Sequence, residues 1–392
     1  MVSQSLVVAP GKERALVSRH QWIFSGAVRT VPDGVDDGEC VDVLSSRGEF
    51  LGRAFLNRKS SIIGRMITYE HVAPEEAIAK NLHQALSYRK KLFGNLSGIM
   101  CRLVNAEADM LSGLIVDLYD TTAVIQISAL GMERHRDCIV QLLRSELPLT
   151  WIYEKSTSPS RKREGLVPKE GTLWGKEQQR ITVNEEELRF AISVKEGQKT
   201  GFFIDQRETR GIVRRLSAGR RVLNCFSYSG AFSVAALSGG ATSCCSIDVS
   251  EGALALLQEN LALNEMGNDG RHTSVCADVF AWLEKEPVDF DLVILDPPAF
   301  AKRKQDLPSA LAGYREINRR VMQKVPPGSF LLTCSCSYHV SPEDFMRMLT
   351  LAALDSRRQI KVVSHHRHAW DHPTSIFHPE TDYLKSALLY IS

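Results

Sequence analysis

The sequence has few features of secreted, membrane-spanning or disulfide-bonded proteins. No apolar run approaches the roughly 20 residues that a membrane helix needs. The first ten residues carry only a short apolar patch without a basic segment, so a signal peptide is not expected. The nine cysteines are scattered and form no C-x-x-C pair, which argues against a zinc knuckle or a disulfide framework. Free thiols fit a reducing cytoplasm, which is the predicted location.

Strong net charge is also missing. Lysine and arginine number 48 and the acidic residues 46, so the formal net charge is only +2. This balance neither requires nor excludes nucleic acid, and any basic binding surface must be local. The length of 392 residues exceeds the roughly 250–300 that one core supports, so we expect two or three domains. With 44% hydrophobic and 24% charged residues, the composition is that of a globular protein.

A metal site is not expected. The histidine-rich stretch His365-His366-Arg367-His368, with His372 beyond it, lacks an H-E-x-x-H motif and cysteines or acids at matching spacing. We interpret this stretch as a polar loop near the substrate.

The N-terminal part is rich in predicted strands. Glu39–Leu44 and Glu49–Phe55, joined by a Ser-Ser-Arg-Gly turn, predict a hairpin. Basic and aromatic residues interleave upstream, at Lys12, Arg14, Arg19 and Trp22. Such a mixture can hold RNA, with cations for phosphates and rings for unstacked bases. It is also typical of a small β-barrel with an aromatic core, which the pattern alone slightly favours.

The middle of the chain mixes helices and strands. Pro74–Phe93 and Glu133–Leu143 have helical spacing. Predicted strands follow at 114–118, 123–127, 151–153 and 188–194. The basic run Lys155–Arg163 is expected to be a solvated loop that can touch phosphates.

From about Arg220 the pattern alternates between strands and helices. The predicted strands are 222–225, 243–248, 273–278, 291–296 and 330–334, and the predicted helices are 231–237, 251–266, 311–324 and 342–353. Short apolar strands separated by amphipathic helices predict a mostly parallel, doubly wound α/β sheet.

Four of these strands end in polar residues, and ligands of such sheets bind at the carboxyl ends of the strands. Asn224–Gly230 is a glycine turn that leads into a helix, which suits a carboxylate. Asp248 stands 18 residues past Gly230, and an acid roughly 20 residues past such a glycine turn suits a ribose diol. Asp278 followed by Val279 can bracket an adenine. Asp296–Phe300, Asp-Pro-Pro-Ala-Phe, is a stiff turn because both prolines fix φ.

In this order the four motifs resemble the class I S-adenosylmethionine-dependent methyltransferases. The chain is more similar still to the bacterial large-subunit ribosomal RNA (cytosine-C5) methyltransferases that carry an N-terminal PUA domain. Supporting segments are Phe24–Val28, Lys199–Arg207, Leu223–Gly230, Gly313–Asn318, Leu331–Ser337, Asp371–Pro373 and Tyr383–Lys385. The resemblance implies a PUA domain over residues 1–72, a small central α+β domain over 73–194 and a Rossmann-like methyltransferase domain over 195–392.

The resemblance also implies a cofactor site for S-adenosylmethionine. Phe203, Asp205 and Arg207 would lie near its methionine end, Asp248 would take the ribose, and Asp278 with Val279 the adenine. Asn224, Phe226, Ser227, Gly230 and Asp296 complete the expected set.

A cytosine-C5 methyltransferase needs a nucleophilic cysteine, because carbon 5 accepts a methyl group once a thiolate has added to carbon 6. Cys336 stands just past a predicted buried strand, and the Ser-Cys-Ser motif of the family falls on it, so we predict Cys336 as the nucleophile. Cys334 is the alternative, since it would point to the same side of a regular strand. Asp296 would hold the base. Ala299 stands where many other RNA cytosine-C5 methyltransferases have a second cysteine.

The expected partner is 23S ribosomal RNA, with no membrane or metal, and a homodimer is left open. Lys302, Arg303 and Lys304 could grip phosphates beside a flipped base that stacks on Phe300 or Tyr338, or could form an exposed loop. Two other functions stay open: methylation of an amino group, for which Asp-Pro-Pro-aromatic motifs are typical, and a non-catalytic role in ribosome assembly.

Overall fold

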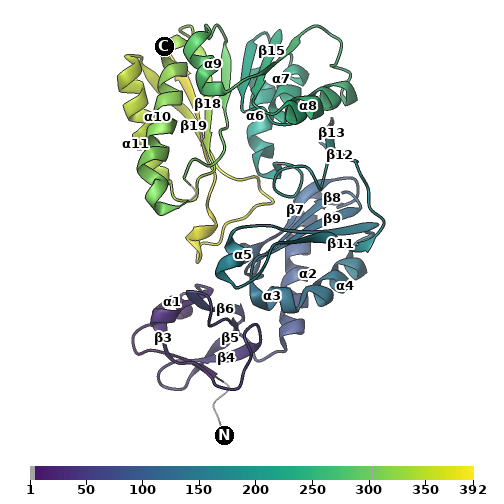
Figure 1. The fold of residues 1–392 in the computed structure, drawn as a ribbon, viewed down its shortest axis with the longest axis vertical. Coiled ribbons are helices and arrows are strands. Elements are labelled where there is room, and N and C mark those ends of the chain that lie inside the picture. The colour runs from purple at the N-terminus through teal and green to yellow at the C-terminus, as the bar shows by residue number, and fades with distance from the viewer. Residues whose placement is uncertain (1–4, 302) are drawn as a thin grey trace. The chain divides into compact units, whose positions relative to one another are not determined.

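A computed structural model describes residues 5–301 and 303–392, and its internal contacts divide the chain into two units. Unit 1 comprises the chain up to Val183 together with Ile192–Ile204 and Trp370–Thr381. Unit 2 comprises Asn184–Ala191, Asp205–Ala369 and Asp382–Ser392. Figure 1 shows the elements of both units. Lys302, one of the predicted RNA-binding residues, lies outside the described residues.

Unit 1 begins with a six-stranded sheet of order β2-β6-β5-β4-β1-β3. Its strands are β1 (Ser5–Val8), β2 (Trp22–Phe24), β3 (Val28–Thr30), β4 (Cys40–Leu44), β5 (Phe50–Leu56) and β6 (Ile62–Thr68), with helix α1 (Arg14–Val17) beside them. The predicted hairpin is confirmed, because β4 pairs with β5 in antiparallel fashion. An aromatic core is wrong: the buried cluster consists of aliphatic residues and Met66, and Phe24 is half exposed.

The second sheet of unit 1 has the order β11-β10-β9-β8-β7. Its elements are α2 (Pro74–Phe93), β7 (Met100–Asn105), β8 (Leu114–Tyr119), β9 (Thr122–Ile127), α3 (Leu130–Arg134), α4 (Arg136–Glu146), β10 (Trp151–Ser156), α5 (Ser160–Arg163) and β11 (Lys169–Gly175). The predicted helix α2 is confirmed: it starts at Pro74, whose fixed φ suits a first turn, and buries Ala77, Leu82 and Leu86. The predicted helix 133–143 is broken at His135 into α3 and α4.

The predicted solvated loop over Lys155–Arg163 is wrong at Lys155, which lies in β10 and is 7% exposed, and at Arg161, whereas Lys162 and Arg163 are exposed. Arg161 lies in the short helix α5 with its side chain 1% exposed. Its guanidinium donates to the carbonyl oxygens of Ile127 and Val167 and pairs with Glu133 at 3.0 Å. A charge that gains a carboxylate and two carbonyl acceptors can be buried, and the sequence does not show these distant partners.

Unit 2 is built on a seven-stranded sheet of order β16-β15-β14-β17-β18-β20-β19. The strands are β14 (Arg221–Cys225), β15 (Ser243–Asp248), β16 (His272–Cys276), β17 (Leu292–Leu295), β18 (Ser329–Ser335), β19 (Ile360–His366) and β20 (Lys385–Ile391). Strands β14 to β18 are parallel, and β20 runs antiparallel between β18 and β19. The predicted doubly wound α/β sheet is confirmed, and the order reverses between β14 and β17.

Helices cover both faces of this sheet (Figure 1). They are α6 (Arg207–Leu216), α7 (Ala231–Ser238), α8 (Glu251–Leu263), α9 (Val279–Lys285), α10 (Leu307–Lys324) and α11 (Pro342–Ser356). Helices α9, α10 and α11 share a core with Leu223, Val293 and Leu331. Helix α7 lies on the opposite face, where Ser233 bonds to Asn224. The chain passes from unit 1 to unit 2 and back within a small two-stranded sheet of β12 (Ile181–Glu185) and β13 (Leu188–Ile192).

The histidine stretch is not the polar loop that the sequence predicts. His365 and His366 belong to strand β19, which pairs with β20. His368 is buried and accepts hydrogen bonds from the backbone N–H groups of Tyr383 and Leu384. Neither β19 nor β20 was predicted, because their polar and apolar residues follow no clear period.

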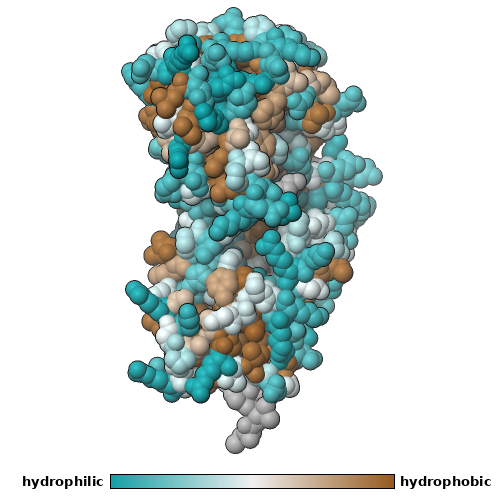
Figure 2. Space-filling model, turned by 60° about the vertical axis from the view of Figure 1, so that its left-hand side comes forward, coloured by the Kyte–Doolittle hydropathy of each residue, from teal (hydrophilic) through white to brown (hydrophobic). Residues whose placement is uncertain are grey.

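The described part of the chain contains no helix long and apolar enough to cross a membrane. Figure 2 shows apolar side chains in separate groups among polar ones over the described residues of one face. Such scattered exposure is ordinary for a globular surface.

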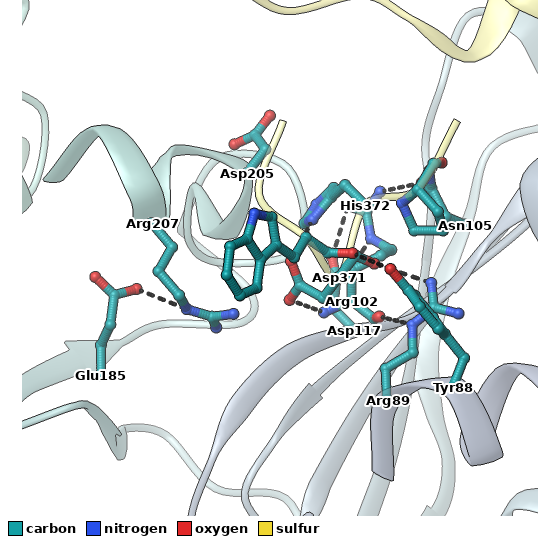
Figure 3. A network of polar contacts seen from close by, with 12 residues as sticks. Tyr88, Arg89, Arg102, Asn105, Asp117, Glu185, Asp205, Arg207, Asp371 and His372 are labelled. Carbon is teal, nitrogen blue, oxygen red and sulfur yellow. Dashed lines mark hydrogen bonds and ion pairs between the residues drawn. The ribbon is translucent and has the colours of Figure 1, made fainter. Parts of the chain in front are cut away.

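Two buried arginines, one on helix α2 and one on strand β7, hold the segment Trp370–Thr381 within unit 1 (Figure 3). Arg89 is fully buried, pairs with both oxygens of Asp109 and donates to the backbone oxygen of Asp371 at 2.9 Å. Arg102 pairs with Asp117, and its backbone N–H donates to the Asp371 carboxylate at 2.9 Å. The segment is therefore held by charges that would be costly to leave unpaired.

Removing the partner of Arg89 should test this arrangement. Asp109→Ala leaves a fully buried guanidinium without its carboxylate, so we expect the free energy of unfolding to fall by about 3–5 kcal/mol. Denaturant unfolding measures the change. Asp137→Ala is the control, because the exposed Asp137 pairs with Arg136 at the surface and should change stability by less than about 1 kcal/mol. Equal effects of the two variants would contradict this account.

Candidate active site

The carboxyl ends of the parallel strands in unit 2 lie level with one another. Cys225, at the end of β14, pairs with Ile247 of β15 and with Leu295 of β17. Leu295 in turn pairs with Thr333 of β18. The residues that follow these strands therefore emerge at one edge of the sheet, beside the point where the strand order reverses.

The glycine turn after β14 has an unusual backbone. Phe226, Tyr228 and Gly230 all have positive φ, at 59°, 47° and 75°. A Cβ atom on Gly230 would lie 2.3 Å from Cγ of Leu257, so only glycine fits. The Tyr228 N–H donates to the Asp248 carboxylate at 2.8 Å. Such a turn before helix α7 forms a site for anions and polar groups.

Polar atoms that can still form hydrogen bonds lie around this turn. The buried Ser227 hydroxyl and the Oδ1 atom of Asn224 have no hydrogen-bond partner among the described residues. The oxygens of Asp248 accept from the backbone N–H groups of Tyr228 and Ser250 and keep free lone pairs. An amino acid and a ribose diol fit this donor and acceptor set, so the predicted residues suit S-adenosylmethionine.

Asp278 and Val279 begin helix α9. The exposed Asp278 carboxylate accepts from the Ala281 N–H at 2.9 Å and so caps the helix. Val279 is 2% exposed and packs in the core of unit 2. Their proposed contact with adenine stays a prediction.

The residues expected at the methionine end are divided between the units. Phe203 belongs to unit 1, where the Lys199 ammonium lies 4.4 Å from the centre of its ring. Asp205 is buried in unit 2 and accepts from the Tyr383 hydroxyl at 2.6 Å. Arg207 starts α6 and lies 3.5 Å from the Glu185 carboxylate, as Figure 3 shows.

The Asp-Pro-Pro turn and Cys336 lie side by side. The Cys336 thiol is 3.9 Å from the backbone oxygen of Pro297. The Ser337 hydroxyl accepts from the Ala301 N–H at 3.3 Å and bonds to the Tyr314 hydroxyl at 3.0 Å. Ser337 therefore joins the end of the turn to helix α10 and fixes the strand end that carries Cys336. The half-buried Phe300 packs 4.5 Å from the Tyr314 ring, whereas Tyr338 is 50% exposed.

The two candidate cysteines differ sharply in environment. Cys334 is fully buried in β18, and burial, with a smaller effect of the nearby Asp296 charge, raises the pKa of its thiol well above the ordinary value. It stays protonated at neutral pH and is a poor nucleophile. Cys336 lies one step past the strand and is only partly buried.

A lysine missed as a site residue lies beside Cys336. Lys385 starts β20 opposite Ser335 and is 5% exposed. Its ammonium donates to the backbone oxygens of Ser337 at 2.7 Å and Tyr383 at 2.8 Å. Burial lowers its pKa to about 8, against the opposing effects of Asp382 and Cys336. The segment Tyr383–Lys385 is one of those that support the family resemblance, and this was the sequence signal that could have identified Lys385 as a site residue.

The residues predicted to bind RNA are mostly exposed. Lys12, Arg14 and Arg19 are exposed in unit 1, and Arg19 lies over the Tyr69 ring at 4.3 Å. Trp22 is half-buried, and its indole N–H donates to Glu107 at 3.0 Å. In unit 2, Lys304 is exposed, and Arg303 pairs with Asp306 at 3.1 Å.

Comparisons with known proteins agree with this fold. The family model of S-adenosylmethionine-dependent methyltransferases matches residues 168–364, and a PUA-like domain model matches residues 6–69. The protein is therefore an S-adenosylmethionine-dependent methyltransferase with an N-terminal PUA-like domain.

Curated relatives show to which family of methyltransferases the chain belongs. The chain is 37% identical to ribosomal RNA large subunit methyltransferase I of Alteromonas mediterranea, covering 100% of both chains. It is 39% identical to the protein of that name from Shewanella denitrificans, covering 96% of both. The chain belongs to the ribosomal RNA large subunit methyltransferase I family.

Solved structures share the whole fold. A methyltransferase crystallised with S-adenosylhomocysteine aligns with a TM-score of 0.85 and 23% identity over 99% of this chain and 100% of that one. A methyltransferase of Streptococcus mutans aligns with a TM-score of 0.83 at the same identity and coverage.

Gly230→Ala should disrupt the glycine turn. The new Cβ would meet Leu257 and force a left-handed φ on alanine, so we expect the free energy of unfolding to fall by about 2–4 kcal/mol. Gly252→Ala in helix α8 is the matched control, since its nearest neighbour would be Ser250 Oγ at 3.9 Å. That change should be neutral or stabilise by up to about 1 kcal/mol. Thermal or denaturant unfolding compares them, and a harmless Gly230→Ala would refute the steric argument.

Proposed function

We propose that the protein transfers a methyl group from S-adenosylmethionine to carbon 5 of a cytosine in 23S ribosomal RNA. The observation that carries the proposal is the partly accessible Cys336 thiol, held beside the Asp-Pro-Pro turn at the edge where the cofactor motifs end. The relatives named for methylation of large-subunit ribosomal RNA support RNA as the substrate class.

The cofactor would lie along the ends of β14, β15 and β16. Asp248 would accept from the ribose, and Ser227 and Asn224 offer buried atoms with free capacity. The backbone N–H groups around Gly230 and the start of α7 suit the carboxylate of the methionine part. When bound, S-adenosylmethionine supplies an electrophilic methyl group on a sulfonium.

In the proposed reaction Cys336 adds as thiolate to carbon 6 of the cytosine. Carbon 5 then carries enough electron density to take the methyl group, and loss of its proton restores the double bond and expels the thiolate. Asp296, at the rigid start of the Pro-Pro turn, would hold the polar edge of the base and favour a protonated ring nitrogen.

Lys385 would support the nucleophile in this reaction. Its ammonium is fixed at the residue next to Cys336 by two carbonyl oxygens. A positive charge beside a sulfur in a buried setting favours the thiolate form. Lys385 would act through Cys336, as a positioning and electrostatic residue.

RNA would be held by the exposed basic residues of both units. Lys12, Arg14, Arg19 and Trp22 belong to the PUA-like part, and Arg303 with Lys304 follows the Pro-Pro turn. In this proposal the three parts 1–72, 73–194 and 195–392 keep separate roles. The first binds RNA and the last carries the chemistry.

A second function rests on the Asp296–Phe300 sequence. Asp-Pro-Pro-Ala-Phe is close to the motif that grips exocyclic amines in amino-group methyltransferases, which need no cysteine. The two functions differ in whether methyltransferase activity is lost or retained when Cys336 is replaced.

Trapping on substituted RNA should reveal the covalent step. Fluorine at carbon 5 blocks the final proton loss, so RNA containing 5-fluorocytidine should stay bound to Cys336 in the presence of cofactor. Denaturing electrophoresis and peptide mass spectrometry measure the adduct. Cys336→Ala should abolish the adduct and reduce turnover on unmodified 23S ribosomal RNA by at least about 1,000-fold.

Cys334→Ala is the matched control two residues away. Because Cys334 is buried and protonated, its variant should keep the adduct, with only a loss of stability. Full activity of Cys336→Ala, or N-methylated nucleosides after RNA digestion, would instead favour the amino-group reaction.

The pH dependence of kcat/KM should report Lys385. Because its pKa is lowered to about 8, its positive charge is present below pH 8 and is lost as the pH rises. We expect activity to decline above about pH 8. Lys385→Arg keeps the charge, so it should remove this decline. Lys385→Met should need a pH about one unit higher to form the thiolate. Identical profiles for all three proteins would exclude the role, and circular dichroism checks that the variants fold.

A further inference from the structure

Three potential metal ligands converge in unit 1, and one of them, His20, is far in the sequence from the other two. His20 follows helix α1, and His378 and Glu380 lie at the end of the segment Trp370–Thr381. One ligand atom from each residue lies within 4.8 Å of the others. The residues offer two imidazoles and a carboxylate, the ligand types that zinc prefers when thiolates are absent.

His378 is the central residue of this cluster, and its imidazole is unsatisfied. The residue is 0% exposed, and neither ring nitrogen has a hydrogen-bond partner among the described residues. The Oε2 atom of Glu380 is likewise buried without a hydrogen bond and lies 3.6 Å from Nδ1 of His378. Buried polar atoms are costly to leave unpaired, so this arrangement points to a missing ligand.

The spacing of the ligand atoms suits a tetrahedral ion. Zinc bonds of about 2.0–2.2 Å place neighbouring ligand atoms roughly 3.3–3.6 Å apart. Nε2 of His20 lies 3.5 Å from Oε1 of Glu380, and Nδ1 of His378 lies 3.6 Å from Oε2 of the same carboxylate. Both separations are too long for good hydrogen bonds. They involve different oxygens of Glu380, and with one ligand atom per residue the three atoms lie within 4.8 Å of one another, so the side chains would close around the ion as it binds.

The surroundings hold the imidazoles in place. Nδ1 of His20 lies 3.3 Å from both the backbone oxygen and the backbone N–H of Trp22. In the tautomer with the proton on Nδ1, the Trp22 oxygen accepts that proton and Nε2 is free for a metal. The Trp22 ring meets His378 edge-on at 4.4 Å.

The charges around the cluster are compatible with a cation. Arg65 is the nearby positive group, and it pairs with Glu164 at 2.8 Å and faces Glu107 at 3.6 Å. Glu107 also accepts from the Trp22 indole. The carboxylates therefore balance Arg65, and Glu380 contributes a further negative charge at the site itself.

We propose that His20, His378 and Glu380 bind one divalent transition-metal ion, Zn²⁺, which fastens the segment Trp370–Thr381 to the end of strand β2. Three protein ligands leave a fourth position for water. The proposed ligands belong to unit 1, whereas the candidate nucleophile belongs to unit 2.

Zinc binding to the full-length protein tests the proposal. Protein without a histidine tag is stripped with a chelator and titrated with Zn²⁺ by isothermal calorimetry. We expect one site per chain, with micromolar or tighter affinity. Co²⁺ in its place should give the visible spectrum of a four-coordinate site without a thiolate charge-transfer band. A thiolate band, or no stoichiometric binding, would overturn the proposal.

Substitutions locate the ion. His378→Gln and His20→Gln should each weaken Zn²⁺ binding more than roughly 100-fold, since even second-sphere changes cost 10–100-fold. His365→Gln, on the exposed face of β19, is the matched control and should bind as the wild type does. Circular dichroism without metal shows whether His378→Gln folds, and His20→Gln serves if it does not. Unchanged affinity in a folded ligand variant would overturn the assignment.

Discussion

In-register pairing of parallel strands is the constraint on which the site depends. β14 pairs with β15 and β17, and β17 with β18, without a register shift. The chain therefore leaves these strands at one level, which brings Asp248, Asp296 and Cys336 to the same edge of the sheet. A slip of one residue in any pair would turn the following side chains to the other face. The pairing of the apolar strands thus determines the positions of the polar residues that follow them.

The sequence was informative where local pattern and burial agree. Helix α2 was predicted with its observed ends from its regular apolar spacing, and in the structure Pro74 stands in its first turn and Gly94 caps its end. The parallel strands were recognisable as short apolar runs followed by acids or turns. The strand ends that define the candidate site followed from these runs, because a parallel sheet gathers carboxyl ends by geometry alone.

Long-range partners explain what the sequence did not reveal. Arg161 looks like part of a solvated basic run until Glu133 and two carbonyl oxygens surround it. Strands β19 and β20 show no clear alternation of polar and apolar residues. The place of Lys385 beside Cys336 depends on the backbone oxygens of Ser337 and Tyr383, which accept from its ammonium and which the sequence does not reveal. His20 and His378 come from opposite ends of the chain. In each case tertiary contacts override a local pattern that favours a solvated residue.

The proposed chemistry must work with one accessible thiol at the candidate active site, that of Cys336. Ala299 occupies the position after Pro-Pro where other RNA cytosine-C5 methyltransferases carry a second cysteine, and Cys334 is buried and protonated. Release of the product does not require a second thiol in principle, because loss of the carbon 5 proton alone expels the first. In the proposed cycle the leaving thiolate would meet the ammonium of Lys385, the same charge that would favour its formation. One buried cation would thus stabilise Cys336 both before addition and after elimination, so the proposed cycle needs a single cysteine.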